Sequence, residues 1–225
     1  MIEKVLFGWS GGKDSTLALY EIQRARKYEI AALLTTVTKD YDRISMHGVR
    51  RVLLEQQAAS LGYPLEIAWI SKHSSNEEYE SKMRETLTKY QSVGVSSVVF
   101  GDLFLEEIRK YRETHLAQIE MKGIFPLWGK NTTELAHTFI DLGFKAIIVC
   151  VDSKALDGKF VGRIIDKKFL LELPLSIDPC GENGEFHSFV FDGPIFRKPI
   201  QFEKGEIVLR DNRFYYCDLI SAQGH

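Results

Sequence analysis

The sequence predicts an α/β fold in which a parallel sheet carries helices on both faces, followed by a smaller mixed α+β part. Three observations support this prediction. Short apolar runs alternate with segments of helical spacing over residues 1–128. A glycine-rich stretch separates the first apolar run from the first helical segment. After Asp178 the chain is rich in Gly, Pro and Phe and has short alternating runs, which are typical of antiparallel strands.

The elements of the first part follow from this periodicity in order. Residues 4–8 predict a strand, and residues 15–27 a helix with its apolar side chains on one face. Strands are then predicted at 30–36, 65–70 and 97–100, and helices at 49–61, 76–91 and 105–121. Gly62 and Pro64 are a typical helix stop. Strands alternating with helices of this length imply right-handed crossovers and a parallel sheet, whose ligand edge lies at the carboxyl ends of its strands.

The pattern of apolar and polar residues changes after Trp128, and we place a domain boundary between residues 128 and 129. A helix at 132–142 and a strand at 145–151 are expected to continue the alternating pattern. Runs at 186–191, 195–202, 206–209 and 213–219 predict a small antiparallel portion.

Composition limits the possible functions. The chain has 225 residues, 44% of them hydrophobic, and a net charge of -2, which suits one sizeable core or two small domains. Without a long basic run, neither DNA nor an anionic membrane is an expected partner. Since we find no signal peptide or long apolar segment, we expect a cytoplasmic protein. The dispersed Cys150, Cys180 and Cys217 are expected to be reduced thiols.

The stretch FGWSGGKDST, Phe7 to Thr16, predicts a phosphate site. A glycine-rich loop before a helix leaves backbone N–H groups pointing into one concavity at the positive end of the helix. Gly11 and Gly12 let the backbone approach a ligand, while Ser10 and Ser15 offer hydroxyl donors. Lys13 is a cation for phosphate oxygens.

Asp14 would be repelled by bare phosphate, so it either holds Mg²⁺ or caps the helix. Two known loops do not fit this stretch. A Walker loop would need one more residue between Gly8 and Gly12 and a hydroxyl in place of Asp14, and no G-x-G-x-x-G is present.

The segment Ser10–Ser15 resembles the PP-loop of the N-type ATP pyrophosphatases, which cleave ATP between the α and β phosphates and transfer AMP to an oxygen of the substrate. Further motifs resemble the diphthine–ammonia ligase family: Met46–Gly48, Val99–Asp102, Phe125–Trp128 and Asp178–Ser188. This resemblance implies a Rossmann-like nucleotide-binding domain of the HUP type at 1–128 and a substrate-binding domain at 129–225. It also implies ATP and Mg²⁺ as cofactors.

The same resemblance implies that the carboxylate of diphthine on elongation factor 2 is adenylated and then amidated by ammonia. No glutaminase domain fits in the remaining residues, so free ammonium is the expected nitrogen source. A homodimer is compatible with the sequence. Tyr111-Arg112-Glu113 stands where family members tend to carry Tyr-Gln-Arg, and a related small acid is therefore an alternative substrate.

A second cluster of candidate residues comprises Glu182, Glu185 and His187, in a segment punctuated by Gly181 and Gly184. A tight turn could direct all three at one place. The carboxylates would then bind ammonium, hold magnesium or accept a proton, and His187 would act as a base or steady the adenylate. The alternative is a solvated polar turn.

Further candidate residues lie at strand ends. Thr35 and Thr36 end the second strand where backbone groups meet adenine in similar folds. His47 precedes a helix and either contacts the nucleotide or substrate or is a structural histidine. Gly101 and Asp102 follow a buried strand, where Asp102 contacts magnesium or ribose, or simply caps a helix. Arg109 and Arg112 share a helix face and meet either phosphate, the substrate carboxylate or solvent.

Two other functions remain open at this point. A PP-loop enzyme that thiolates or amidates tRNA is one alternative. No Cys-x-x-Cys pair or basic run is present, so Cys180 would have to act alone. A non-catalytic protein that binds an adenine nucleotide is the other. Lys13, Asp14 and the 182–187 cluster favour catalysis.

Overall fold

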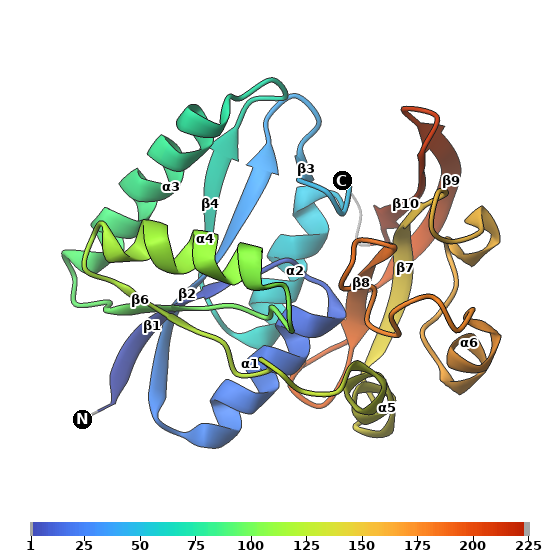
Figure 1. Ribbon diagram of the computed structural model, residues 1–225, viewed down its shortest axis with the longest axis horizontal. Helices are drawn as coiled ribbons and strands as arrows, with labels where there is room; N and C mark the ends of the chain where they lie inside the picture. The colour runs from blue at the N-terminus through green and yellow to red at the C-terminus, as the bar shows by residue number, and fades with distance from the viewer. Residues whose placement is uncertain (1, 223–225) are drawn as a thin grey trace.

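The computed structural model describes residues 2–222 and contains two sheets that lie side by side (Figure 1). The strands of the first sheet are β1 (Glu3–Gly8), β2 (Tyr28–Thr38), β3 (Arg43–Ile44), β4 (Leu65–Ile70), β5 (Ser97–Val99) and β6 (Lys122–Ile124). Its helices are α1 (Lys13–Ala25), α2 (Arg51–Leu61), α3 (Asn76–Gln91) and α4 (Glu106–Ala117). The predicted fold class is confirmed.

The second part of the chain builds an antiparallel sheet. Its elements are α5 (Thr132–Asp141), β7 (Lys145–Asp152), a short 3-10 helix η1 (Gly158–Phe160), α6 (Lys167–Glu172), β8 (Phe186–Asp192), β9 (Phe202–Arg210) and β10 (Phe214–Ser221). The strand order is β8-β7-β10-β9. Within residues 2–222, no helix is both long and apolar enough to cross a membrane.

The parallel strands pair in the order β4-β2-β1-β5-β6, and β3 adds a short antiparallel pairing to β2. β1 therefore lies at the point where successive connections leave in opposite directions. Such a switch point opens a crevice beyond the carboxyl ends of the strands. The loop after β1, residues 9–12, lies in this crevice.

Alternation along β1 shows how the sheet is covered on both faces. Val5 and Phe7 belong to one buried cluster with α1 and α2, whereas Leu6 belongs to a second cluster with Leu87 of α3 and Leu116 of α4. Successive side chains of a strand point to opposite faces, so both faces are packed. The first cluster continues into β7, β8 and α5, so the antiparallel sheet shares its core with α1 and α2.

Two predicted strands differ from the structure. Residues 145–151 do not continue the parallel sheet, because β7 pairs antiparallel with β8 and β10. Residues 195–201 form no strand: Arg197 donates its backbone N–H to Ser60 O at 3.1 Å, and Phe196 donates to Gly193 O at 3.0 Å. Pro194 and Pro199 lack the N–H that a ladder needs. The strands β3 and β6 and the helices η1 and α6 were not predicted.

Candidate functional site

The loop between β1 and α1 is held in a conformation that requires glycine. Gly11 has φ 73°, and a Cβ there would lie 2.7 Å from Gln57 Oε1 and 2.8 Å from a Leu54 methyl. Gly12 forms the N-cap of α1, and a Cβ there would lie 3.1 Å from both His47 Cε1 and Ser188 O. The tight packing around both positions explains the glycine pair.

Gln57 of α2, which was not predicted, holds this loop from behind. Its side chain is fully buried, and Oε1 accepts a hydrogen bond from Trp9 Nε1 at 3.0 Å. Its Nε2 donates to Gly11 O at 3.0 Å and to Val190 O at 2.6 Å. Gly11 O also accepts from Val190 N at 2.9 Å. The carbonyl of the loop is therefore turned towards α2 and β8.

Lys13 is a buried cation at the start of α1, with a relative exposure of 3%. Its ammonium donates to Asp14 Oδ1 at 2.6 Å and Oδ2 at 2.8 Å, and to the carbonyl oxygen of Cys180. Burial alone would lower the pKa of Lys13, but Asp14 outweighs it and raises the pKa above its ordinary value. Lys13 is therefore charged, and its partners come from α1 and from the turn that precedes β8.

Several polar groups of the loop are hydrogen-bonded to protein atoms. Gly12 N donates to Ser10 Oγ at 3.2 Å, and Lys13 N donates to Ser188 Oγ at 3.2 Å. Ser10 Oγ also lies 3.0 Å from Ser15 Oγ, and Ser15 Oγ donates to Gly12 O at 3.0 Å. N–H groups at the positive end of a helix, as here at the start of α1, are suited to bind phosphate oxygens.

The segment 178–188 wraps over this loop from the second sheet. Asp178 Oδ1 accepts from Cys180 N at 2.9 Å and from Glu182 N at 3.2 Å, which folds the chain into the predicted tight turn. Gly181 has φ 68°, and a Cβ there would lie 2.8 Å from Phe186 O. The turn carries Glu182 towards the first sheet, where its carboxylate accepts from Leu103 N at 2.8 Å.

Glu182 has an unusual charge environment. Burial raises the pKa of Glu182 to about 7, the hydrogen bond from Leu103 opposes this, and the negative charges of Asp14 and Asp102 add to it. Burial likewise raises the pKa of Asp14 despite its bond to Lys13. The carboxyl groups of Asp14 and Asp102 thus lie near that of Glu182, although the three residues are far apart in the sequence. A carboxyl that titrates near neutral pH is suited to proton transfer.

Glu185 lies in the same turn but is 5% exposed. Its Oε1 accepts from Asp178 N at 3.1 Å and from Asn183 Nδ2 at 3.0 Å, whereas the buried Oε2 has no hydrogen-bond partner. One oxygen therefore holds the turn closed. The other is a buried acceptor that a cationic donor would satisfy.

His47 and His187 meet face to face between the two sheets. Their rings are stacked with centroids 4.6 Å apart, and His47 Nδ1 lies 3.3 Å from Ser188 O. Burial and the neighbouring His187 lower the pKa of His47 to about 3, and burial and Lys13 lower the pKa of His187 to about 4. Both imidazoles are neutral at pH 7. They can donate or accept a hydrogen bond but carry no charge.

The remaining candidates lie at strand ends around the loop. Thr35 is 4% exposed with an unpartnered Oγ1, and Thr36 O accepts from Ser45 N at 3.3 Å. A Cβ on Gly101 would lie 2.9 Å from Ser15 N, so this glycine allows the chain after β5 to pack against the start of α1. Asp102 pairs with Arg112 of α4 at 2.7 Å.

Arg109 of α4 lies near two rings of the predicted FPLW motif. Its guanidinium carbon lies 4.9 Å from the ring centroid of Phe125 and 4.7 Å from that of Trp128, and its Nε bonds Glu113 at 2.8 Å. Both predicted arginines of α4 are thus engaged with neighbouring side chains, Arg109 with Glu113 and Arg112 with Asp102.

Cys180 has the properties of a structural thiol. Its side chain is buried, Sγ lies 3.3 Å from Thr132 O, and burial raises the pKa of Cys180 to about 12. A thiol that stays protonated is a weak nucleophile, which disfavours a thiolating role. Among the residues that the structure describes, no group of three or more His, Cys, Asp or Glu is arranged to hold a metal ion.

The signal that would have identified Gln57 is present in the sequence. Leu53, Leu54, Ala58 and Leu61 form the buried face of α2, and Gln57 falls on this face with them. A polar residue on an apolar helix face must find partners inside the protein. Ser188 ends the motif Asp178–Ser188, but local sequence does not indicate its contact with the loop, because that contact depends on β8 reaching α1.

Two family models match the chain. Residues 3–123 match the diphthamide synthase N-terminal domain, and residues 131–221 match the diphthamide synthase C-terminal domain. A protein of Schizosaccharomyces pombe named diphthine–ammonia ligase is 26% identical over 224 residues, a match that covers 91% of this chain and 37% of the yeast protein. The chain thus spans much less than the whole of that relative.

Two mammalian proteins of the same name are also similar. The Rattus norvegicus protein is 26% identical over 227 residues, covering 89% of this chain and 83% of the rat protein. The Homo sapiens protein is 28% identical over 120 residues, covering 51% of this chain and 45% of the human protein.

Proposed function

The chain belongs to the diphthamide synthase family, and on this premise we propose that it is an ATP-dependent, AMP-forming amide ligase. The observation that carries the proposal is the loop of residues 10–15, which lies at the switch point of a parallel sheet with a buried, charged Lys13. The names of the relatives support an amidation reaction.

ATP would bind with its β and γ phosphates in the loop. The N–H groups of Gly12 and Lys13 and the Lys13 ammonium would exchange their present partners, Ser10, Ser188, Asp14 and Cys180 O, for phosphate oxygens. As a substrate carboxylate attacks the α phosphate, charge gathers on the departing pyrophosphate. Donors that are already oriented by the fold stabilise this charge.

Mg²⁺ fits this site as a companion of the phosphates. The charges of Asp14 and Asp102 act unfavourably on the carboxylate of Glu182, and a divalent cation would relieve this repulsion. Mg²⁺ is commonly bound by one or two carboxylates together with substrate phosphates, so a cluster of three protein ligands is unnecessary. Asp14 would hold the ion, which would offset the charge of the leaving pyrophosphate.

The turn 178–188 would serve the second half-reaction, in which ammonia displaces AMP from the acyl adenylate. Glu182 would accept the proton that ammonium must lose, since its pKa of about 7 makes it an effective base at neutral pH. The unpartnered Oε2 of Glu185 would bind ammonium, and the neutral His187 would donate a hydrogen bond to the adenylate.

The acid that is amidated would be diphthine on elongation factor 2 or a related acid. The test is to incubate the protein with ATP, Mg²⁺ and ammonium, with and without diphthine-bearing elongation factor 2, and to measure AMP and pyrophosphate. We expect both products in equal amounts, dependent on an acid. Formation of ADP and orthophosphate would refute the proposed function.

A further inference from the structure

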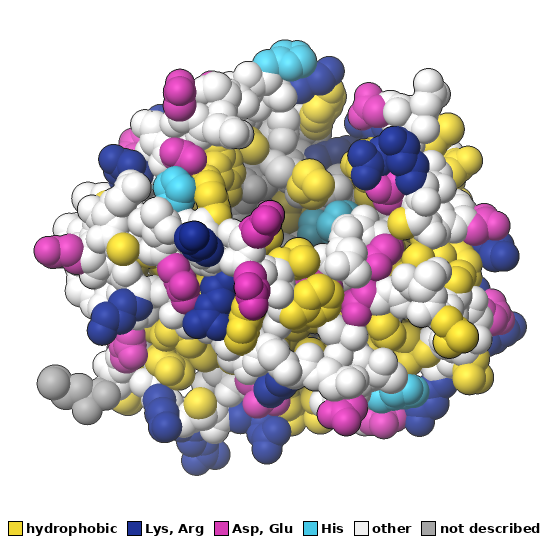
Figure 2. Space-filling model, viewed as in Figure 1, with side chains coloured by type: hydrophobic (Ala, Val, Ile, Leu, Met, Phe, Trp, Pro, Cys, Tyr) yellow, Lys and Arg dark blue, Asp and Glu magenta, His cyan; other side chains and the backbone are white. Residues whose placement is uncertain are grey.

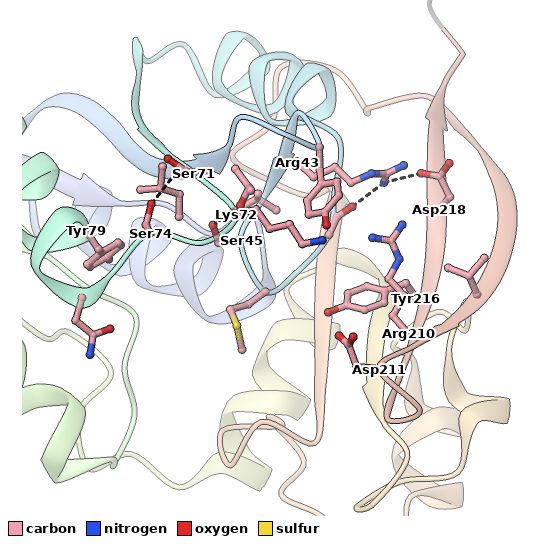
Figure 3. A pocket seen from close by; sticks show the side chains of 18 of the residues that line it. Arg43, Ser45, Ser71, Lys72, Ser74, Tyr79, Arg210, Asp211, Tyr216 and Asp218 are labelled. Atoms are coloured by element: carbon pink, nitrogen blue, oxygen red, sulfur yellow. Dashed lines mark hydrogen bonds and ion pairs between the residues drawn. The ribbon is translucent and has the colours of Figure 1, made fainter.

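A cavity of about 650 Å³ lies between the two sheets, next to the phosphate loop (Figure 3). One wall consists of the carboxyl ends of β2 and β4, and the other of the β9–β10 hairpin. Figure 2 shows this face hollowed between the two parts, with Lys and Arg side chains beside the opening. The volume is that of a site for a small ligand. The site residues predicted from the sequence do not line it.

The segment 45–48 separates the cavity from the phosphate loop. Ser45, Met46 and Gly48 line the cavity, whereas His47 between them turns away, so that its Nδ1 lies 3.3 Å from Ser188 O. The same ring lies 3.1 Å from the position that a Cβ on Gly12 would take. A molecule in the cavity is therefore one residue away from the site that we assign to the nucleotide's phosphates.

Two cations face each other across this cavity. Figure 3 shows Lys72, which follows β4, and Arg210 of the hairpin pointing towards one another. Lys72 Nζ lies 5.2 Å from the ring centroid of Tyr41, and Arg210 Cζ lies 5.8 Å from the same centroid. Both positive charges thus lie close to one ring, although they belong to opposite walls.

The negative charges near Lys72 are the carboxylates of Asp211 and Asp40. Among the residues drawn in Figure 3, Arg43 pairs with Asp218 at 2.8 Å, but neither Lys72 nor Arg210 forms an ion pair. The pKa of Lys72 is raised first by its hydrogen bond with Tyr41, and Asp211 and Asp40 contribute less. Two like charges that face one another repel, and an anion bound between them removes the repulsion.

We propose that this cavity binds the acid substrate, and that the substrate carries a second carboxylate held between Lys72 and Arg210. The reacting carboxylate would extend past His47 to the phosphate loop. Hydroxyl groups of Thr38, Ser45 and Tyr216 supply hydrogen bonds along the wall. This inference rests on the proposed function. It favours a small dicarboxylic acid over diphthine, whose fixed quaternary ammonium charge would be repelled by the same two cations.

The test compares dicarboxylates with monocarboxylates of matched length. Succinate, glutarate and adipate are titrated calorimetrically against butyrate, pentanoate and hexanoate, with the protein in Mg²⁺ and α,β-methylene-ATP. We expect at least one dicarboxylate to bind about tenfold more tightly than its matched monocarboxylate, and Lys72→Gln and Arg210→Gln each to remove most of this preference. Lys122→Gln, at the start of β6 and the opposite edge of the sheet, is the matched control and should bind as wild type does.

Equal binding of both classes, no binding of any dicarboxylate, or a preference that survives in Lys72→Gln and Arg210→Gln would overturn the inference. A crystal structure showing the adenosine of the analogue in the cavity would do the same. A parallel experiment with ATP in place of the analogue measures AMP release. It distinguishes the proposed ligase function from the assignment of the cavity. Dicarboxylate binding that depends on Lys72 and Arg210 without AMP formation refutes the ligase but keeps the cavity assignment. AMP release with diphthine-bearing elongation factor 2 that is unchanged in both variants keeps the ligase and overturns the assignment.

Discussion

At the scale of single residues, the site depends on side chains that orient the backbone of the loop. Lys13 is the residue that would contact phosphate, but Gln57 fixes the direction of the Gly11 carbonyl by bonding it together with Val190 O and Trp9. Both residues are buried. The motif Ser10–Ser15 contains Lys13, but it does not contain Gln57, which holds the loop in place.

We predict that Gln57→Leu destabilises the protein by about 2–4 kcal/mol, because a similar volume is kept while buried polar groups of Trp9 and Val190 lose their partners. The affinity for ATP should also fall about tenfold, since the loop is no longer held from behind. Urea unfolding and ATP titration measure the two effects. Gln56→Leu is the control, because Gln56 is partly buried and donates a single bond to Ser221 Oγ at 2.8 Å. Similar losses in both variants would contradict this role of Gln57.

The second prediction at this scale concerns the pH dependence caused by Glu182. Because the folded state raises the pKa of Glu182 from its ordinary value to about 7, the unfolded state releases this proton first, and stability falls as the pH rises from about 4.5 to 7. Glu182→Gln should lose less stability than wild type between pH 5 and pH 8. Its amide formation should also lack the rise through about pH 7. Thermal melts at pH 5 and pH 8 measure the change in stability of each protein. An equal loss of stability in wild type and Glu182→Gln would count against this role of Glu182.

At the scale of elements, ion pairs of the Asp218 carboxylate connect β10 to the segment 43–50. Asp218 of β10 pairs with Arg43 at 2.8 Å and with Arg50 at 2.7 Å, and Arg43 also donates to Gly48 O at 2.7 Å. This places His47 over the phosphate loop. Burial alone would raise the pKa of Asp218, but the hydrogen bonds and charges of the two arginines outweigh it and lower the pKa to about 2.

We predict that Asp218→Asn lowers the free energy of unfolding by about 1–3 kcal/mol at pH 7, because two charge-assisted interactions are lost. The wild-type contribution is complete above the ordinary Asp pKa and disappears as the pH falls through about 2. The difference between the two proteins should therefore shrink in acid. Asp192→Asn, which removes an outlying pair with Lys145, is the control. A difference that is constant from pH 7 to pH 2 would exclude the assigned cause.

The elements also show what the sequence could predict. The parallel strands and their helices follow from local periodicity, and the Ser10–Ser15 loop from its residues. The run 145–151 reads equally well as a strand of either sheet, because a strand buried on both faces has no alternating pattern. Its antiparallel partners, β8 and β10, are fixed by tertiary packing. For the same reason the contact of Ser188 with the loop was not foreseen.

At the scale of the whole molecule, the two sheets share one core and one site. Residues of β1, α1 and α2 belong to the same buried cluster as residues of β7 and β8. Lys13 bonds the carbonyl of Cys180, and Lys13 N bonds Ser188. The loop therefore receives partners from the antiparallel sheet, and the fold brings together motifs that are far apart in the sequence.

We predict that both parts unfold in a single transition. Trp9, Trp69 and Trp128 all lie before the antiparallel sheet, so tryptophan fluorescence reports on the first part, while far-ultraviolet circular dichroism reports on both. The two urea midpoints should coincide, as expected for one cooperative unit. Separate midpoints would show that the shared core does not couple the sheets.

We propose that the loop after β1 binds the β and γ phosphates so that they leave together as pyrophosphate. The most direct measurement is a crystal structure with Mg²⁺ and α,β-methylene-ATP, in which the bond to be cleaved is blocked. We predict that the β and γ phosphates lie on the N–H groups of Gly12 and Lys13, with the Lys13 ammonium moved from Cys180 O to phosphate. An analogue bound with its phosphates away from residues 10–15, and with Lys13 still on Cys180 O, would contradict it.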